Sequence, residues 1–204
     1  MLTWLQTHAA ALNVVVGGVT LAVWIAYLHL FFVSFRRARR AVIHIGMAAQ
    51  QGEEARCLVT NMGADTVYIL AIKVDLLCGD ETFSALVTDR IEEDVVLGGN
   101  FRDKTNQGPL AGGEVVDIGS FRNILCRISQ QKDAVPDFET CDAMEVTVVV
   151  AAQQADVLMG GSKRYDITRF GHGIQFHPTD VLTRQITSRS RRRALHRMIT
   201  QRAG

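Results

Sequence analysis

Residues 9–33 read AAALNVVVGGVTLAVWIAYLHLFFV, and a basic cluster of four arginines follows within residues 36–40. A helix of these 25 residues is about 37 Å long, more than the ~30 Å hydrocarbon core of a bilayer requires. The run has no charged residue and no polar face, which a soluble helix would normally show. A cleaved signal peptide fits poorly, because residues 1–8 lack Lys and Arg and the run is long. The sequence therefore predicts one membrane-spanning helix over residues 9–35.

The arginines predict the orientation of this helix. Arginine is enriched on the cytosolic side of membrane helices, so the head, residues 1–8, is expected outside and the rest of the chain in the cytosol. The localisation expected is the inner (plasma) membrane, with a single span. The four cysteines form no CxxC pair, and reduced, partly buried thiols are expected in a cytosolic domain. Their even number also allows two disulfides if the orientation is reversed. The basic juxtamembrane cluster consists of Arg36, Arg37, Arg39 and Arg40.

One face of the predicted span carries small side chains. Gly18, Ala22 and Ala26 recur every four residues, and His29 continues the same face. Small residues at this spacing let a second helix approach closely, although Gly and Ala are also common in membrane helices. His29 lies near the predicted cytosolic interface, where headgroups, a neighbouring helix or a bound cofactor are its possible partners. We expect headgroups or a helix rather than a cofactor.

Charge divides the chain into an acidic body and basic ends. The net charge is +1, but residues 36–40 and 179–204 together carry eleven arginines against one acidic residue. Residues 41–178 carry eleven basic and twenty acidic residues. A distribution of this kind suits a domain held near an anionic membrane, with the basic segments touching lipid.

The middle of the chain, residues 41–176, has the pattern of a β domain. Short runs rich in β-branched residues alternate with turns, and seven to nine strands are expected. The segment 121–128 instead has helical spacing, with Ser120 as its N-cap. Residues 160–162 are read as a hairpin turn, and residues 98–113 as a loop. The expected strands are 41–47, 56–60, 66–77, 82–88, 94–97, 114–118, 144–151, 156–159 and 164–169.

Many short strands with one helix are typical of a two-sheet sandwich. The layout is similar to that of an immunoglobulin-type sandwich, so that architecture, without membership of the family, is expected for residues 41–176. No Cys…Trp…Cys signature accompanies it, because the chain has no Trp after Trp24, although Cys57 and Cys126 have a plausible separation. The fold class predicted is one transmembrane helix, a mainly-β domain and a basic, partly helical tail.

The tail, residues 177–204, is predicted to contain two short helices or one helix bent at its serines. Pro178 and Thr179 have the composition of a helix start, with Thr179 as the N-cap. Arg191, Arg192 and Arg193 follow and are candidates for contact with lipid headgroups or an acidic partner. A solvated, mobile tail is the ordinary alternative. Nucleic-acid binding is not expected, because the body is acidic and the tail lacks aromatic side chains.

Signatures of catalysis or of cofactor binding are missing from the sequence. No HExxH, GxGxxG, GxxxxGK[ST], GxSxG or CxxC motif occurs. His172 and His177 lack a nearby Cys or acidic cluster, and the acidic residues 92–94 fit a solvated loop. Cys57 and Cys126 lie in apolar surroundings that suit packing rather than nucleophilic catalysis. We therefore expect no catalytic residue, metal or cofactor.

These observations favour a non-catalytic, single-pass accessory or scaffold subunit. Its helix is expected to pack against an integral membrane protein complex or a second copy, and its β domain to dock on that assembly. The alternatives are a membrane-tethered sensor that binds a small ligand and, less well supported, a membrane-anchored enzyme. A polar pocket with a perturbed His or Cys would favour these alternatives.

Overall fold

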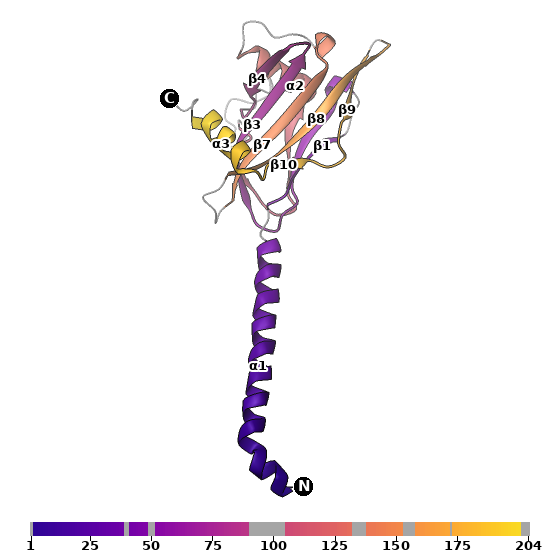
Figure 1. The fold of residues 1–204 in the computed structure, drawn as a ribbon. Coiled ribbons are helices and arrows are strands. Elements are labelled where there is room, and N and C mark those ends of the chain that lie inside the picture. The colour runs from indigo at the N-terminus through magenta and orange to yellow at the C-terminus, as the bar shows by residue number, and fades with distance from the viewer. Residues whose placement is uncertain are drawn as a thin grey trace. The chain divides into compact units, whose positions relative to one another are not determined.

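The computed structural model describes residues 2–38, 41–48, 52–89, 105–131, 138–152, 158–171 and 173–200. The chain divides into two compact units, residues 1–40 and 41–204. The first is a single long helix, α1 (Leu2–Ala38), and the second is a mostly-β domain (Figure 1). The prediction of a long apolar N-terminal helix followed by a mainly-β domain is confirmed to this extent.

The β domain contains two antiparallel sheets (Figure 1). The three-stranded sheet has the order β1-β2-β6, and the seven-stranded sheet the order β10-β8-β7-β3-β4, with β5 paired to β3 and β9 paired to β8. The strands are β1 (Ile43–Ala48), β2 (Arg56–Asn61), β3 (Val67–Cys78), β4 (Glu81–Leu86), β5 (Gly108–Leu110), β6 (Val115–Ser120), β7 (Ala143–Ala152), β8 (Leu158–Phe170), β9 (Gly173–Pro178) and β10 (Arg184–Gln185). The helical segments of the domain are η1 (Gly52–Glu54), α2 (Phe121–Ser129), η3 (Phe138–Thr140) and α3 (Arg189–Thr200).

One hydrophobic core joins the two sheets. Ile45 and Val59 of the three-stranded sheet belong to the same buried cluster as Ile72 and Val148 of the seven-stranded sheet. Alternation along β2, where every second side chain is buried, follows from the period of two in a strand with one face on the core. Strand β7 is buried almost continuously, because its outer face is covered as well.

That cover comes from the C-terminal helix α3. Leu195 of α3 packs with Ala71 of β3 and Val149 of β7, and Ile199 packs against the same cluster. A strand that is buried on both faces has a continuous run of apolar residues rather than an alternating pattern. The sequence of β7 has such a run.

Helix α2 begins where the sequence predicts. The Ser120 side chain accepts a hydrogen bond from the backbone N–H of Asn123 at 3.2 Å, as an N-cap does. Phe121, Ile124 and Ile128 are buried on one face of the helix. The helical spacing in this segment is therefore confirmed.

The outer edge of strand β1 is closed by side chains from the segment around β10. The N–H of Ile45 donates to Thr183 Oγ1 at 2.7 Å, and the N–H of Ile43 donates to Gln185 Oε1 at 3.2 Å. Gln185 Nε2 donates to the carbonyl of Ile43 at 2.6 Å. An exposed strand edge can pair with another chain, and these contacts occupy this one.

Two local predictions in this region are wrong. Residues 160–162 form no turn, because β8 runs straight through them, and residues 179–186 form no helix. Both errors have one cause: β10 pairs with β8 at Gly161 and Ser162, and the N–H of Ile186 donates to the Gly160 carbonyl at 2.7 Å. Gly160 and Gly161 therefore allow neighbouring backbones to approach closely, and they do not form a hairpin turn. The tail contains one described helix, α3, which begins directly after Ser188 and includes Ser190.

Other strand predictions differ in detail. Strand β5 lies inside the segment 98–113 that was expected to be a loop, and β9 was not predicted. The expected strand 94–97 lies outside the described residues.

Candidate functional site

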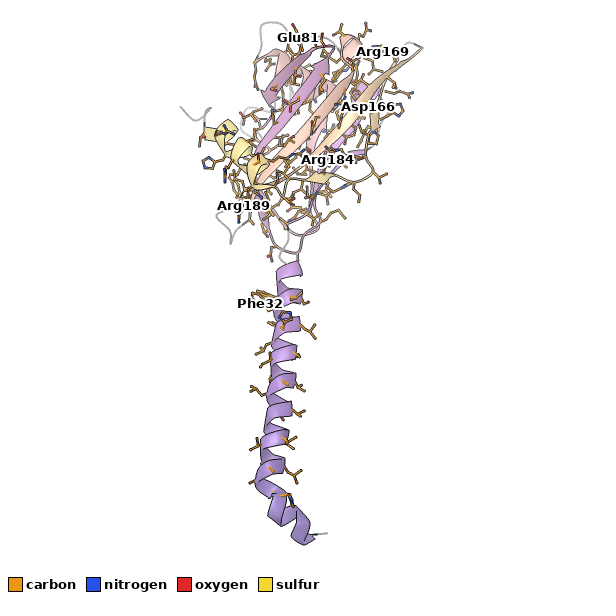
Figure 2. The ribbon with its side chains drawn as sticks, viewed as in Figure 1. Phe32, Glu81, Asp166, Arg169, Arg184 and Arg189 are labelled. Atoms are coloured by element: carbon orange, nitrogen blue, oxygen red, sulfur yellow. A yellow bond between two sulfur atoms is a disulfide. The ribbon has the colours of Figure 1, made fainter. Side chains whose placement is uncertain are left out.

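Helix α1 presents apolar side chains to its surroundings on all sides. Its segment His8–Phe35 has 28 residues and a mean hydropathy of 2.0, and none of it is buried. At the helical rise it is about 42 Å long, enough to cross the hydrocarbon core of a bilayer. The hydroxyl of Thr20 donates to the carbonyl of Val16 at 2.8 Å, so this polar group is satisfied within the helix. Figure 2 shows side chains, Phe32 among them, projecting from the helix.

The predicted helix-packing residues share one exposed face of α1. Gly18, Ala22, Ala26 and His29 are all exposed, and at 100° per residue they fall within an arc of about 80°. A Cβ atom built on Gly18 meets nothing within 4 Å. The strip is therefore open along the face on which a second helix would pack.

An aromatic ladder, formed by Trp24, Tyr27, Phe31 and Phe35, runs along the opposite face of α1. The Trp24 and Tyr27 ring centroids are 6.1 Å apart in an edge arrangement, and those of Phe31 and Phe35 are 6.0 Å apart and stacked. The ladder is centred about 180° from the small-residue strip. The ladder was not predicted, although the i, i+3 and i+4 spacing of its residues was a usable signal in the sequence.

The basic segments differ in how much the structure describes. Arg36 and Arg37 belong to α1, whereas Arg39 and Arg40 lie outside the described residues. Arg191 and Arg193 are exposed on α3, and Arg192 is half-buried. The helix is capped by Ser188, whose Oγ accepts from the N–H of Arg191 at 3.3 Å. Since the apolar residues of α3 contact the seven-stranded sheet, most of its arginines remain available to solvent or a partner.

Two of the four cysteines are joined, whereas reduced thiols are expected in a cytosolic domain. Cys78 at the end of β3 forms a disulfide with Cys141, 63 residues later. The pairing of β3 with β7, in which Leu77 lies opposite Ala143, brings them together. Cys57 and Cys126 are not joined to each other: Cys57 is buried and Cys126 is exposed. Burial raises the pKa of Cys57 to about 12, so its thiol is poorly suited to nucleophilic chemistry.

A polar cluster lies where β8 meets β1 and residues 181–183. Lys163 is buried, and its Nζ donates to the Val181 carbonyl at 3.1 Å and lies 5.9 Å from the centroid of the Tyr165 ring. Burial lowers the pKa of Lys163, and burial together with the charge of Lys163 lowers the pKa of His44. His44 Nδ1 lies 3.4 Å from Thr183 Oγ1. These contacts join β8 to the three-stranded sheet, and we assign them a structural role.

A polar groove of about 460 Å³ lies on the seven-stranded sheet. Its charged groups largely pair with one another: Arg164 lies 3.3 Å from Asp166, and Arg184 lies 3.4 Å from Asp180. The described lining contains neither His nor Cys, the groups that would most favour a catalytic reading. It consists of Glu145, Ser162, Arg164, Asp166, Thr179, Asp180 and Arg184.

The remaining candidate ligands do not assemble into a described site. Within the described ranges, no group of three or more His, Cys, Asp or Glu side chains is placed to hold a metal ion. His177 is exposed on β9, while His172 and the acidic residues 92–94 lie outside the described residues. Gly160 and Gly161 lie within a strand and open no helix, so they form no phosphate-binding loop.

No protein-family model, no curated protein and no solved structure matches this chain.

Proposed function

We propose that the protein is a non-catalytic, single-pass accessory subunit of the inner (plasma) membrane. Its helix α1 packs against an integral membrane protein complex or a second copy, and its β domain docks on the same assembly. The observation that supports this most directly is the combination of a fully exposed apolar helix of spanning length with a separate, well-packed β domain. A helix of this kind needs lipid or other helices around it.

The two faces of α1 support the proposal of helix packing. Association of helices in a membrane gains little from hydrophobicity, since lipid tails are equally apolar, and depends on close van der Waals contact. The strip of Gly18, Ala22 and Ala26 allows that contact, and His29 offers a polar group at its end. The aromatic ladder on the opposite face gives bulky apolar side chains to lipid.

For the orientation, we propose the N-terminus outside and the β domain in the cytosol, as the arginines of residues 36–40 indicate. The disulfide between Cys78 and Cys141 favours the reversed orientation, because such bonds persist in oxidising compartments. An extracytoplasmic β domain is therefore the second candidate. In either case, Arg191, Arg192 and Arg193 are proposed to contact anionic headgroups or an acidic partner surface.

The β domain itself is proposed to be an immunoglobulin-type sandwich that serves as the docking module. Two antiparallel sheets that share one core support this proposal. The polar groove around Arg164 and Arg184 favours one functional alternative, a sensor that binds a small polar ligand there. A ligand that raises the melting temperature of the unaltered protein but not of an Arg164→Gln variant would support the sensor.

The test of the accessory role is co-purification after extraction with a mild detergent. Gly18→Leu or Ala22→Leu places a bulky side chain on the strip and should release the bound partners, whereas Val16→Leu, about 120° from the middle of the strip, should not. His29→Ala should weaken the association by about 1 kcal/mol or less. If the strip variants retain the same partners as the unaltered protein, α1 does not pack through this face.

A further inference from the structure

Three exposed apolar side chains adjoin one another at the end of the β domain where the chain enters it. The N–H of Met62 donates to the carbonyl of Val42 at 2.7 Å, and Val115 lies across the sheet opposite Thr60, two residues before Met62. Asn61 points into the core and is fully buried, so Thr60 and Met62 lie toward the other face. The exposed fractions are 37% for Val42, 64% for Met62 and 51% for Val115. We call these three residues the entry patch.

The same end of the domain offers apolar surface from the second sheet. Tyr68, near the start of β3, is 46% exposed and pairs with Pro109 of β5. The loops at this end abut closely, since a Cβ atom on Gly112 would lie 2.5 Å from the Ala64 carbonyl oxygen. Loops that connect the two sheets therefore lie side by side at this end of the domain, with Tyr68 on the outer face of the seven-stranded sheet and the entry patch on that of the three-stranded sheet.

From this arrangement we infer that the entry patch rests in the headgroup region of the membrane that α1 crosses. The inference depends on the proposed membrane span but not on its orientation. From Phe35, the last residue of the apolar segment, to Val42 the chain can reach at most about 18 Å, with α1 helical to Ala38 and four extended residues beyond. The tether thus keeps the patch close to the lipid surface.

The chemistry of this end fits an interface rather than bulk water or the hydrocarbon core. Met and Val supply apolar contact, and a tyrosine with an amphipathic ring is typical of the headgroup level. Asp65 and Glu114 lie at the same end and are acidic, and the Glu114 carboxylate accepts from the N–H of Ala111 at 2.7 Å. The four arginines of residues 36–40 adjoin this end in the sequence and offset that negative charge near anionic lipid.

The test measures the depth of a fluorophore on the full chain in lipid vesicles. The fluorophore is attached to Met62→Cys in a Cys126→Ser background without reductant, because Cys57 is buried and Cys78 and Cys141 are joined. The matched control is Asp80→Cys, in the turn between β3 and β4 at the far end of β3. Lipids carrying a nitroxide at the headgroup serve as quenchers, and the Cys126→Ser protein alone gives the labelling background.

Quenching at residue 62 should exceed quenching at residue 80 roughly twofold or more, because only the entry patch lies in the interface. Equal quenching at residues 62 and 80 would overturn the inference, and the entry patch would then be assigned to contact with a protein partner. A third label at Val23→Cys, with nitroxide on the lipid tails, tests the span itself. If the label at residue 23 is not quenched, the proposed membrane span is wrong. If it is quenched while the label at residue 62 is not, the span stands and only the inference about the entry patch is wrong.

Discussion

The disulfide between Cys78 and Cys141 links the end of β3 to the segment that leads into β7. In the chain-entropy account, closing a loop of 63 residues restricts the unfolded chain and stabilises the fold by about 4 kcal/mol. In this account the disulfide stabilises the domain by restricting the unfolded chain rather than by adding native contacts.

Cys141→Ser should lower the free energy of unfolding of the purified, oxidised protein by about 2–4 kcal/mol. Denaturant unfolding followed by circular dichroism measures the change, and reductant should produce a similar loss in the unaltered protein. Cys126→Ser is the matched control, because Cys126 is exposed and free. If Cys141→Ser and Cys126→Ser unfold at the same denaturant concentration, the disulfide contributes nothing to stability.

His44 gives the domain a pH dependence of predictable sign. Burial and the nearby Lys163 lower the pKa of His44 in the fold, so near its ordinary pKa the unfolded chain binds more protons than the native chain. Stability should therefore fall as the pH drops from above 6.5 to the lowered folded-state pKa. Because His44 is only partly buried, we expect a modest effect.

His44→Gln should lessen the loss of unfolding midpoint between pH 7.5 and pH 5, measured by urea denaturation at each pH. His177→Gln, at an exposed position on β9, is the matched control for removing an imidazole. An equal loss in all three proteins would mean that carboxylates elsewhere produce the pH dependence.

At the scale of the elements, the pairing of β8 with its neighbours depends on a glycine pair. A Cβ atom on Gly160 would lie 2.4 Å from the backbone oxygen of Val148, and one on Gly161 would lie 2.7 Å from the Thr183 side chain. The first contact is with backbone, which cannot rotate away, so Gly160 is the stricter requirement.

Gly160→Ala should reduce the free energy of unfolding by about 1–3 kcal/mol, as overpacking does. Gly46→Ala in β1 is the matched control, because its Cβ would meet only the His44 ring at 3.8 Å, an ordinary contact. That variant should be neutral or slightly stabilising. Equal stability of the two variants, measured by denaturant unfolding, would contradict the close approach of β8 and β7.

The elements that could be predicted from the sequence are those with local signals. Length and uniform apolarity sufficed for α1, and Ser120 with helical spacing sufficed for α2. Strand β10 could not be predicted, because it exists only through pairing with Gly161 and Ser162 of β8. The Cys78–Cys141 pair has the same non-local origin, in the register of β3 with β7.

In the candidate site too, features that lie on one element could be predicted from the sequence, and features that depend on the pairing of distant strands could not. The strip of Gly18, Ala22 and Ala26, like the aromatic ladder opposite, follows from helical geometry alone. The entry patch does not, since Val42, Met62 and Val115 meet only after β1, β2 and β6 have paired. The polar groove likewise needs β8 beside the segment 179–184.

For the whole molecule, the proposed orientation in the membrane decides which compartment contains the β domain. The arginines after α1 favour a cytosolic β domain, and the disulfide favours an oxidising compartment. Charge acts on insertion, before the domain has folded, whereas a disulfide forms only after two distant segments have met. We therefore base the expected orientation on the arginines rather than on the disulfide, and we expect a cytosolic β domain.

The exposed thiol of Cys126 provides a native probe of this orientation. In intact cells a membrane-impermeant maleimide should leave Cys126 unlabelled, and labelling should appear once the cells are permeabilised. A reporter fused after Gly204 should likewise be active only in the cytosol. The Cys126→Ser protein controls for labelling elsewhere, since Cys57 is buried. Labelling of Cys126 from outside would reverse the orientation and make the disulfide an extracytoplasmic structural bond, because the same thiol cannot face both compartments in a single-span protein.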